Sequence, residues 1–476
     1  MTDIKKITIA ILASGVAAWA FAQDQSASSP YQDKSGYVRV SQKDPRYFEY
    51  DDGKPYIAVG LNYCFDRKTN NMAEIRVHYE RDFAAMKENG ANFARIMMQA
   101  WPTELEPSAG KYDEGKFEYI DWLIETARKN GIKLKLCMEA FRTKDGSRYA
   151  KSDMFKDMNE YLTSQKCRDM YLAKIDLLAK RYANCNTIFA IELWNEMNCV
   201  SAKHENVVAW TDYMCREIKK RFPNTLVVQS LGSFDRESLI PIYKDYMVLK
   251  SNDAAQVHRY LDLGAKLPVC QGPFVELGAS AVREIRAMTG DTKPILLAET
   301  GAVKPRHTGP WEYYEVDKDG VIVHDLAFGV FFSGGAGTGH VWHWDQLLID
   351  PNHWWHYGRF NEAIKKVNVL EEKFQPKLVS VDNVNCYALV GEKNTMIFCR
   401  DMNSDWKTEF VNATAPEPRA GVILDLSQFC PPEKIKNFKK LRFYDPWQNK
   451  WTKAEISGSK IRLPKFTRSI VVRLYE

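Results

Sequence analysis

The stretch TIFAIELWNEMN, Thr187 to Asn198, decides the fold that we expect for this chain. Its residues Ile188 to Leu193 are mostly apolar and predict a strand buried on both faces. Glu196 follows at the end of that strand, where removal from water makes a carboxylate costly. In a parallel α/β barrel the carboxyl-terminal strand ends form the active-site face. We therefore predict that Glu196 is a catalytic acid/base, with an ordinary strand-end glutamate as the alternative.

The size and composition are those of a globular protein rather than a nucleic-acid-binding one. The 476 residues suffice for one large domain and a smaller one, or for three small ones. Hydrophobic residues make up 45% of the chain and charged residues 27%, which is ordinary for such proteins. The net charge is only +5 and no long basic run occurs, so we expect no nucleic-acid partner.

The amino terminus has the pattern of a secretory signal peptide. Two lysines precede the apolar run Ile7–Phe21, and small residues flank the cleavage site predicted after Ala22. We assign residues 1–22 to this signal and the polar residues 23–36 to a disordered leader. No cysteine follows the run and no later apolar stretch could span a bilayer, so we expect no membrane anchor. The predicted location is secreted or periplasmic.

Strand and helix signals alternate after a hairpin signal around Asp52-Gly53. The expected strands are 56–64, 91–98, 132–140, 188–193, 225–232, 253–260, 293–301 and 340–348. The expected helices are 79–89, 117–130, 168–182, 207–221, 237–244, 281–288, 326–332 and 360–374. Eight such pairs close a barrel, so we predict an α/β fold with a (β/α)8 TIM barrel over residues 37–376. A doubly wound open sheet is the runner-up.

The residue pattern of the sequence changes after Gln375-Pro376. Helical spacing disappears, and short strands alternate with turn residues. We predict a small β-sandwich accessory domain over residues 377–476, which packs on the barrel, with sugar binding as a less favoured extra role. The ten cysteines form no CxxC pair, so we expect buried thiols for most of them, and the sequence leaves one or two disulfides open.

A second carboxylate stands at a place comparable to that of Glu196. Glu299, in KPILLAETG, ends the seventh expected strand, and Glu196 ends the fourth. Strands four and seven face each other across a barrel mouth, so both carboxylates can point at one sugar. Retaining glycoside hydrolysis needs such a pair, an acid and a nucleophile about 5–5.5 Å apart. We predict that Glu196 is the acid/base and Glu299 the nucleophile.

Beyond this pair, the chain resembles the retaining glycoside hydrolases of clan A, most closely the cellulase-type enzymes of family 5. The resemblance covers about Tyr37 to Phe374. The matching positions are Arg95 on strand two, Asn195-Glu196 on strand four, His258 and Tyr260 on strand six, Ala298–Thr300 on strand seven, and Trp342 or Trp344 on strand eight. The chain departs from the pattern at CMEAF, which has Glu139 and lacks the usual histidine, and at Met197, which replaces a proline.

The resemblance implies roles for the residues around the two carboxylates. Tyr260 would hydrogen-bond Glu299, and Arg95 would keep Glu299 ionised. Glu196, beside Trp194 and screened from solvent, should have a raised pKa that lets it hold a proton.

Other residues are expected to bind the sugar. Asn195 would contact the hydroxyl next to the reacting carbon, and His258 would position Glu196 or a sugar hydroxyl. Trp342 or Trp344 would form an aromatic floor beneath the reacting sugar. The full set of predicted substrate-binding residues is Asn195, Arg95, His258, Tyr260, Trp342, Trp344, Glu139 and Asn62.

Two further patterns suggest other chemistry only superficially. The histidines at 340, 343, 353 and 356 form two H-x-x-H spacings, but no cysteine or carboxylate framework completes a metal site. The run Gly334–Gly339 lies between a helix and a strand, the reverse of the dinucleotide-binding order. We therefore predict neither a metal nor a cofactor.

These observations favour a retaining β-glycoside hydrolase that cleaves β-linked polysaccharides or oligosaccharides by double displacement. β-Mannan and β-glucan are the candidate substrates, and carbohydrate is the expected partner. The alternatives are a carbohydrate-binding protein on an inactive barrel and a transglycosylase.

Overall fold

Seven parallel strands and one bridged segment close into a barrel in a computed structural model of the chain, which describes residues 29–456 and 458–476. The strands are β4 (Gly60–Leu61), β5 (Phe93–Met97), β6 (Lys133–Cys137), β7 (Ile188–Glu192), β8 (Leu226–Val228), β9 (Ala255–Leu261) and β10 (Ile295–Ala302). Val341 forms parallel bridges to both Leu61 and Thr300 and so joins the last strand to the first. The predicted (β/α)8 barrel is confirmed.

The eighth strand is much shorter than the predicted range 340–348. Strand pairing in this segment is limited to the isolated bridges of Gly337 and Val341. His343 has a φ of 51°, a left-handed conformation that breaks an extended chain. The following residues Asp345–Ile349 form a π-helical turn instead of a strand.

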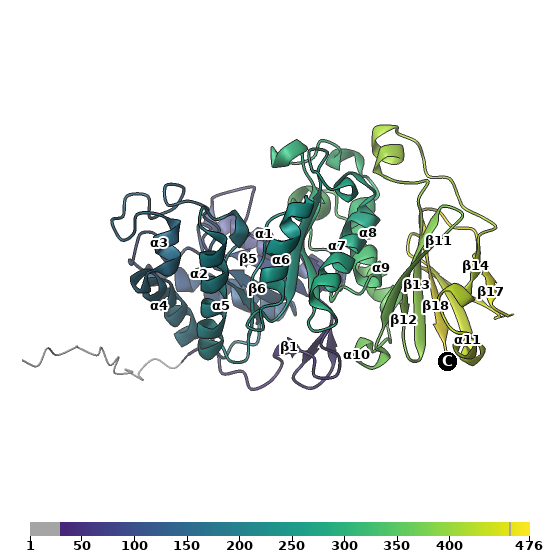
Figure 1. Cartoon of the computed structure of the whole chain (residues 1–476), viewed down its shortest axis with the longest axis horizontal. Coiled ribbons are helices and arrows are strands. Elements are labelled where there is room, and N and C mark those ends of the chain that lie inside the picture. Colours follow the sequence, from purple (N-terminus) through teal and green to yellow (C-terminus); the bar gives the residue numbers. More distant parts are fainter. Residues whose placement is uncertain (1–28, 457) are drawn as a thin grey trace, which may run out of the picture.

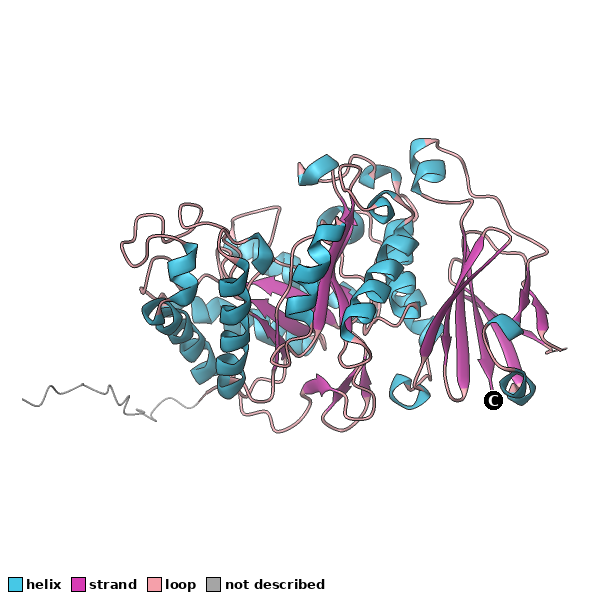
Figure 2. Cartoon of the chain, in the orientation of Figure 1, coloured by secondary structure: helices cyan, strands magenta, loops and turns pink. Residues whose placement is uncertain are grey.

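Helices surround the barrel strands, as Figure 2 shows. They are α1 (Met72–Glu88), α2 (Phe117–Lys129), α3 (Met158–Thr163), α4 (Gln165–Tyr182), α5 (His204–Arg221), α6 (Ile240–Met247), α7 (Phe274–Thr289), α8 (Val321–Phe332), α9 (Trp355–Ile364) and α10 (Val369–Glu372). The predicted helix 360–374 is divided into α9 and α10, because Lys366 adopts a left-handed φ of 62° between them.

The chain before the barrel closes its lower end in the view of Figure 1. Strands β1 (Val38–Val40), β2 (Phe48–Tyr50) and β3 (Pro55–Tyr56) form an antiparallel sheet. The Phe48 ring packs on Phe189 near the start of β7, with 5.1 Å between their centroids. This sheet therefore covers the amino-terminal ends of the barrel strands, opposite the end where Glu196 lies.

The predicted disordered leader is wrong for residues 29–36. Tyr31 is only 5% exposed and packs against Tyr182 of α4. Asp33 pairs with Arg128 of α2 at 2.8 Å. The predicted signal peptide, residues 1–22, and leader residues 23–28 lie outside the described residues. Among the helices that the structure describes, none combines the length and apolar character needed to cross a bilayer.

The carboxyl-terminal part is a six-stranded antiparallel sheet with a two-stranded ribbon, at the right of Figure 1. The sheet has the order β11 (Gln375–Val381), β12 (Val384–Val390), β13 (Asn394–Asp401), β18 (Ser469–Tyr475), β15 (Lys440–Asp445), β16 (Lys450–Ala454), and the ribbon pairs β14 (Ile423–Asp425) with β17 (Lys460–Arg462). One face of the sheet shares the barrel core, where Phe398 stacks on Phe328 of α8 at 5.0 Å. The other face forms a second core with Leu424 and Ile461 of the ribbon.

The expectation of buried thiols for most of the cysteines is confirmed, and the disulfides that the sequence left open do not form. All ten are free thiols, and nine of them are buried. Cys386 and Cys399 lie directly opposite each other on β12 and β13, yet remain unlinked.

Candidate active site

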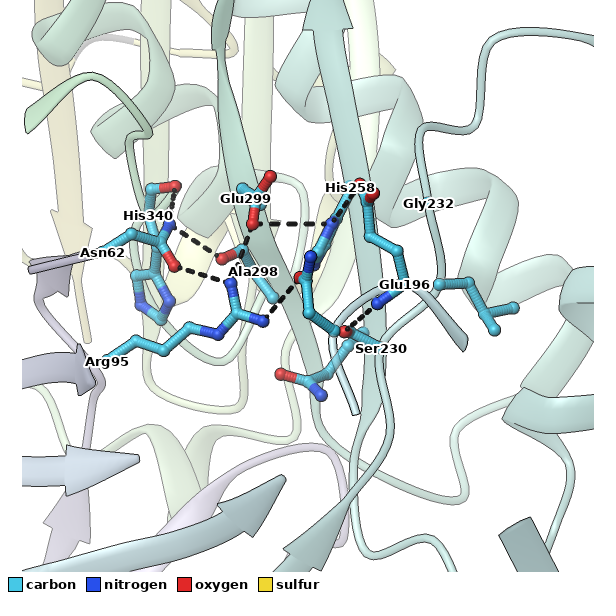
Figure 3. Close-up of polar contacts among 12 residues, drawn as sticks. Asn62, Arg95, Glu196, Ser230, Gly232, His258, Ala298, Glu299 and His340 are labelled. Carbon is cyan, nitrogen blue, oxygen red and sulfur yellow. Dashed lines mark hydrogen bonds and ion pairs between the residues drawn. The ribbon is translucent and has the colours of Figure 1, made fainter. Parts of the chain in front are cut away.

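The two predicted carboxylates meet at the carboxyl-terminal end of the barrel (Figure 3). Glu196 follows β7, and Glu299 lies within β10. One oxygen of each carboxylate and a ring nitrogen of His258 all lie within 4.8 Å of one another. His258 Nδ1 is 3.2 Å from Glu196 and 3.7 Å from Glu299. Both side chains are largely withdrawn from solvent, with residue exposures of 9% for Glu196 and 5% for Glu299.

A strained backbone presents Glu196. Its φ and ψ are both 54°, a left-handed conformation that disfavours residues with a side chain. The turn is fixed by Ser230, whose Oγ accepts from the Glu196 amide at 3.3 Å and whose carbonyl accepts from Met197 at 3.2 Å. Gly232 leaves room for this turn, since a Cβ there would lie 2.7 Å from the Cys199 Sγ.

A bulge in β10 sets the direction of Glu299. Leu297 pairs with Val257 and Glu299 with His258, so Ala298 is an extra residue in the strand. The Tyr260 hydroxyl donates to one oxygen of Glu299, and Arg95 donates to the other at 2.8 Å. These are the contacts that we expected of Tyr260 and Arg95.

Arg95 is fully buried and connects the site to the barrel interior. It donates to both oxygens of Glu192 at 2.8 and 2.9 Å, and to Asn195 Oδ1 at 2.8 Å. The Lys135 ammonium lies 3.0 Å from Glu192. Burial alone would raise the pKa of Glu192, but the charges of Arg95 and Lys135 lower it to about 2.

Glu192 is a residue that our sequence analysis missed. Its position inside a buried apolar strand was the available signal, because a buried carboxylate requires a cationic partner.

The predicted substrate residue Asn195 is half-buried. Since Arg95 occupies its carbonyl oxygen, its amide nitrogen is the group that can reach a sugar hydroxyl.

Asn62 lies beneath the site and cannot contact a substrate as predicted. It is fully buried, and its amide nitrogen donates to the carbonyls of Ala298 at 3.1 Å and His340 at 2.9 Å. Its Oδ1 accepts from Arg95 at 3.3 Å. Asn62 therefore orients Arg95 and holds the bulge of β10 (Figure 3).

The prediction of a raised pKa for Glu196 is wrong for the free protein. Burial does raise it, but the hydrogen bond and charge of His258 and the charge of Arg142 outweigh burial and lower the pKa to about 2. His258 Nδ1 lies 3.2 Å from Oε1, and an Arg142 nitrogen donates to Oε2. The buried Trp194 ring packs on Phe141 and Trp210, and its Nε1 donates to the Phe141 carbonyl at 2.9 Å.

Glu139 is also misplaced by the sequence prediction. Its side chain is fully buried and pairs with Arg148, at 3.0 Å through one nitrogen, and with Lys174 of α4. These cations outweigh burial and lower the pKa of Glu139. Glu139 therefore binds the loop after β6 to α4, and is not available to a sugar.

Only one of the two candidate tryptophans can form an open sugar platform. Trp344 is 1% exposed and is covered by Phe65, by Tyr63 and by the Arg67 guanidinium, which lies 4.2 Å from its ring centroid. Trp342 is partly exposed and meets Trp344 edge-on at 5.3 Å. The structure therefore favours Trp342 as the floor.

The four histidines of the H-x-x-H spacings bind separate partners. The His340 ring contacts the Ala58 carbonyl at 3.3 Å, and His343 contacts the Tyr314 hydroxyl at 3.1 Å. His353 and His356 face backbone carbonyls. Across the described ranges, these histidines do not converge on one point.

The family model for cellulase, glycosyl hydrolase family 5, matches residues 54–318, which is more than half of the chain. The chain belongs to glycosyl hydrolase family 5. This family 5 protein is 30% identical over 308 residues to mannan endo-1,4-beta-mannosidase 3 of Oryza sativa subsp. japonica, covering 57% of this chain and 64% of that one. It thus spans slightly less than two thirds of the rice relative.

Two other similarities extend the comparison. Mannan endo-1,4-beta-mannosidase 7 of Arabidopsis thaliana is 25% identical over 334 residues, covering 63% of this family 5 chain and 76% of the relative. A crystal structure of a glycoside hydrolase family 5 protein from Bacteroides vulgatus superposes with a TM-score of 0.61 at 12% identity, covering 93% of this chain and 94% of that one. The shared fold therefore includes the carboxyl-terminal sheet as well as the barrel.

Proposed function

We propose that the protein is a retaining β-glycoside hydrolase of β-linked polysaccharides or oligosaccharides. The observation that carries the proposal is the placement of one oxygen of Glu196 within 4.8 Å of one oxygen of Glu299. Retaining enzymes hold their carboxyl groups about 5–5.5 Å apart, whereas inverting enzymes leave about 6.5–9.5 Å for a water molecule. The short separation favours direct attack by a carboxylate.

Each residue then has a role in a two-step displacement. Glu299 attacks the anomeric carbon while Glu196 donates a proton to the departing glycosidic oxygen. In the second step Glu196 takes a proton from water, which attacks the glycosyl-enzyme and restores Glu299. Burial and the charge of Glu299 raise the pKa of Tyr260, so its hydroxyl stays protonated and donates to the nucleophile. The two carboxylates suffice for this chemistry, which uses no cofactor.

β-Mannan is the substrate that we favour, because both plant relatives are named mannan endo-1,4-beta-mannosidases.

We also propose that the pattern at residues 1–22 exports the enzyme to the periplasm or the medium, where such polymers are found. The sheet and ribbon of residues 377–476 would act as a small β-sandwich that supports the barrel. Both faces of the sheet lie against hydrophobic cores, which disfavours sugar binding on it.

The test uses the two carboxylates separately. Glu299→Gln should abolish hydrolysis of both mannan and a 2,4-dinitrophenyl β-mannoside, because no nucleophile remains. Glu196→Gln should abolish mannan hydrolysis but should still release dinitrophenolate in the first step, because that leaving group needs no proton. Wild-type hydrolysis rates on mannans, β-glucans, xylans and galactans identify the sugar. Full activity of either variant on polymer would refute the assignment.

Retention is tested separately by proton NMR of the first product formed. We expect the β-anomer to appear first and then to mutarotate. An α-anomer as the first product would show that water, not Glu299, attacks the sugar.

A further inference from the structure

Arg142 closes the solvent side of Glu196. It lies on the loop between β6 and α3, and its guanidinium donates to the Oε2 atom of Glu196. The other oxygen, Oε1, already faces His258 at 3.2 Å. The Arg142 side chain is 57% exposed, whereas that of Glu196 is 11% exposed. Oε2 is therefore the oxygen paired with an exposed surface cation, whereas Oε1 faces the buried His258.

A groove of about 590 Å³ begins at Arg142. This volume is typical of a small-molecule binding site. Its walls come from the loops after β5 and β6 and include Gln99, Glu104, Phe141, Arg142, Thr143 and Arg148.

The barrel order assigns this groove to one side of the reaction. β5 and β6 are consecutive in the sheet with β7, which carries Glu196, whereas Glu299 lies on β10, which pairs with β9. In a double displacement the glycosyl half of the substrate becomes attached to the nucleophile, and the half beside the acid departs. The groove is linked to the acid through Arg142, which lines it and contacts Glu196, and no residue of β9 or β10 is among its lining residues. We therefore infer that it faces the departing half.

We propose that this groove binds the leaving-group sugars of the substrate, and that Arg142 exchanges its ion pair with Glu196 for hydrogen bonds to those sugars. The inference rests on the proposed function and deepens it. Guanidinium N–H groups are donors only, and sugar hydroxyl and ring oxygens accept from them. The exchange frees Oε2 to approach the glycosidic oxygen, and it removes a positive charge that holds Glu196 in its ionised form. Arg142 is thus a positioning residue and a leaving-group contact.

The other charged or titratable groups near Glu196 are not expected to leave it when the sugars bind, as Arg142 does. His258 is fully buried beside Oε1, whereas Arg142 is the exposed partner. The remaining neighbours are Tyr243 on α6, Tyr260 on β9, Glu299 on β10, Cys199 in the turn after Glu196, and His307 on the loop after β10. His307 has a carboxylate of its own, Asp262, at 3.7 Å.

The experiment compares wild type with Arg142→Gln on two substrates. One is the β-linked oligosaccharide that the wild type hydrolyses fastest, and the other is the dinitrophenyl glycoside of the same sugar, which cannot fill the groove. For the oligosaccharide, we expect Arg142→Gln to raise KM about tenfold through the loss of a charged donor. We also expect the alkaline limb of kcat/KM to move up by about one pH unit, because Glu196 loses a neighbouring positive charge.

For the dinitrophenyl glycoside, KM should stay within about twofold of wild type, since its leaving group does not use the groove. Lys144→Ala is the matched control, because it removes a cation from the same loop whose ammonium lies over the Phe155 ring, 5.5 Å from its centroid. This variant should keep the wild-type KM and pH profile. An unmoved alkaline limb, or an equal rise of KM for both substrates, would overturn the inference while leaving the proposed function intact. A wild-type protein that hydrolyses neither substrate would overturn the proposed function itself.

Discussion

At the scale of single residues, the Tyr260 hydroxyl is the clearest test of how the nucleophile is held. Tyr260→Phe keeps the ring shape but leaves Glu299 with Arg95 as its remaining donor. A hydrogen bond to a charged group contributes about 1.5–3 kcal/mol, so we expect kcat/KM to fall about 10- to 100-fold with an unchanged Tm. Steady-state kinetics and circular dichroism would measure both. Wild-type kinetics would mean that the contact is dispensable.

For Glu192, the prediction concerns the stability of the protein and not the rate of catalysis. Glu192→Gln leaves Arg95 and Lys135 buried without their shared carboxylate, since both lie within 3.0 Å of it. Removing one partner of a buried ion pair costs about 3–5 kcal/mol, so we expect a loss of that order in the free energy of unfolding at neutral pH. Urea titration measures it.

The same variant should show a distinct pH dependence. The pKa of Glu192 is about 2 in the folded protein, below its ordinary value of 4.5. The unfolded chain therefore takes up this proton first, and the stabilisation is complete above about pH 4.5 and declines as the pH falls toward 2. The difference in unfolding free energy between wild type and Glu192→Gln should shrink over this window. A difference that stays constant from pH 6 to pH 3 would contradict the charged state of Glu192.

The sequence predicts correctly those residues whose role depends on lying near the carboxyl-terminal ends of the barrel strands. Glu196 follows the end of β7 and Glu299 lies in the carboxyl-terminal half of β10, and the structure brings them together as expected. The position of a residue along the barrel axis does not determine where its side chain points. For this reason Glu139 and Asn62 were wrongly assigned to the substrate. Their side chains turn to Lys174 and to backbone carbonyls, partners far along the chain that strand periodicity does not reveal.

At the scale of elements, seven of the eight strands overlap their predicted ranges, because segments rich in apolar residues precede helix signals. The first of them, β4, is limited to Gly60–Leu61 within the predicted range 56–64. The eighth was not predicted correctly, because its tryptophans and histidines suit a strand while a left-handed His343 bends the chain. The glycine run Gly334–Gly339, which precedes this segment, allows a close approach of two backbones at the seam of the barrel. Gly337 bridges Ala58, and a Cβ at Gly337 would lie 2.3 Å from the Ala58 carbonyl oxygen.

This close approach predicts that the barrel seam does not tolerate a methyl group. Gly337→Ala must displace backbone atoms, so we expect it to destabilise the protein by about 1–3 kcal/mol. Gly358→Ala is the control, because it lies inside α9 with its nearest neighbour, the Asn89 carbonyl oxygen, at 3.7 Å. That variant should be neutral or more stable by up to about 1 kcal/mol. Equal free energies of unfolding of the two variants in urea titration would mean that the backbones at Gly337 and Ala58 can separate without loss of stability.

At the scale of the whole molecule, the carboxyl-terminal sheet completes the barrel's hydrophobic core. Every residue of α8 is buried, although an ordinary barrel helix would expose one face to water. The reason is that β12 and β13 cover its outer side, with Phe398 stacked on Phe328. The sequence predicted a helix over residues 326–332, but the strands that bury it come from the carboxyl-terminal part of the chain.

A buried ion pair across this contact tests whether the two parts unfold as one. Arg400 of β13 donates to both oxygens of Asp325 in α8, at 2.7 and 3.1 Å, and both side chains are at most 3% exposed. Arg400→Ala leaves Asp325 buried without its cation, so we expect a loss of about 3–5 kcal/mol. Because α8 belongs to the barrel core, calorimetry should show a single transition at a lower Tm. Lys54→Ala, which removes the exposed pair with Asp52, should leave the Tm unchanged. Two separate transitions, with the barrel's Tm unaffected by Arg400→Ala, would show that the sheet is an independent appendage.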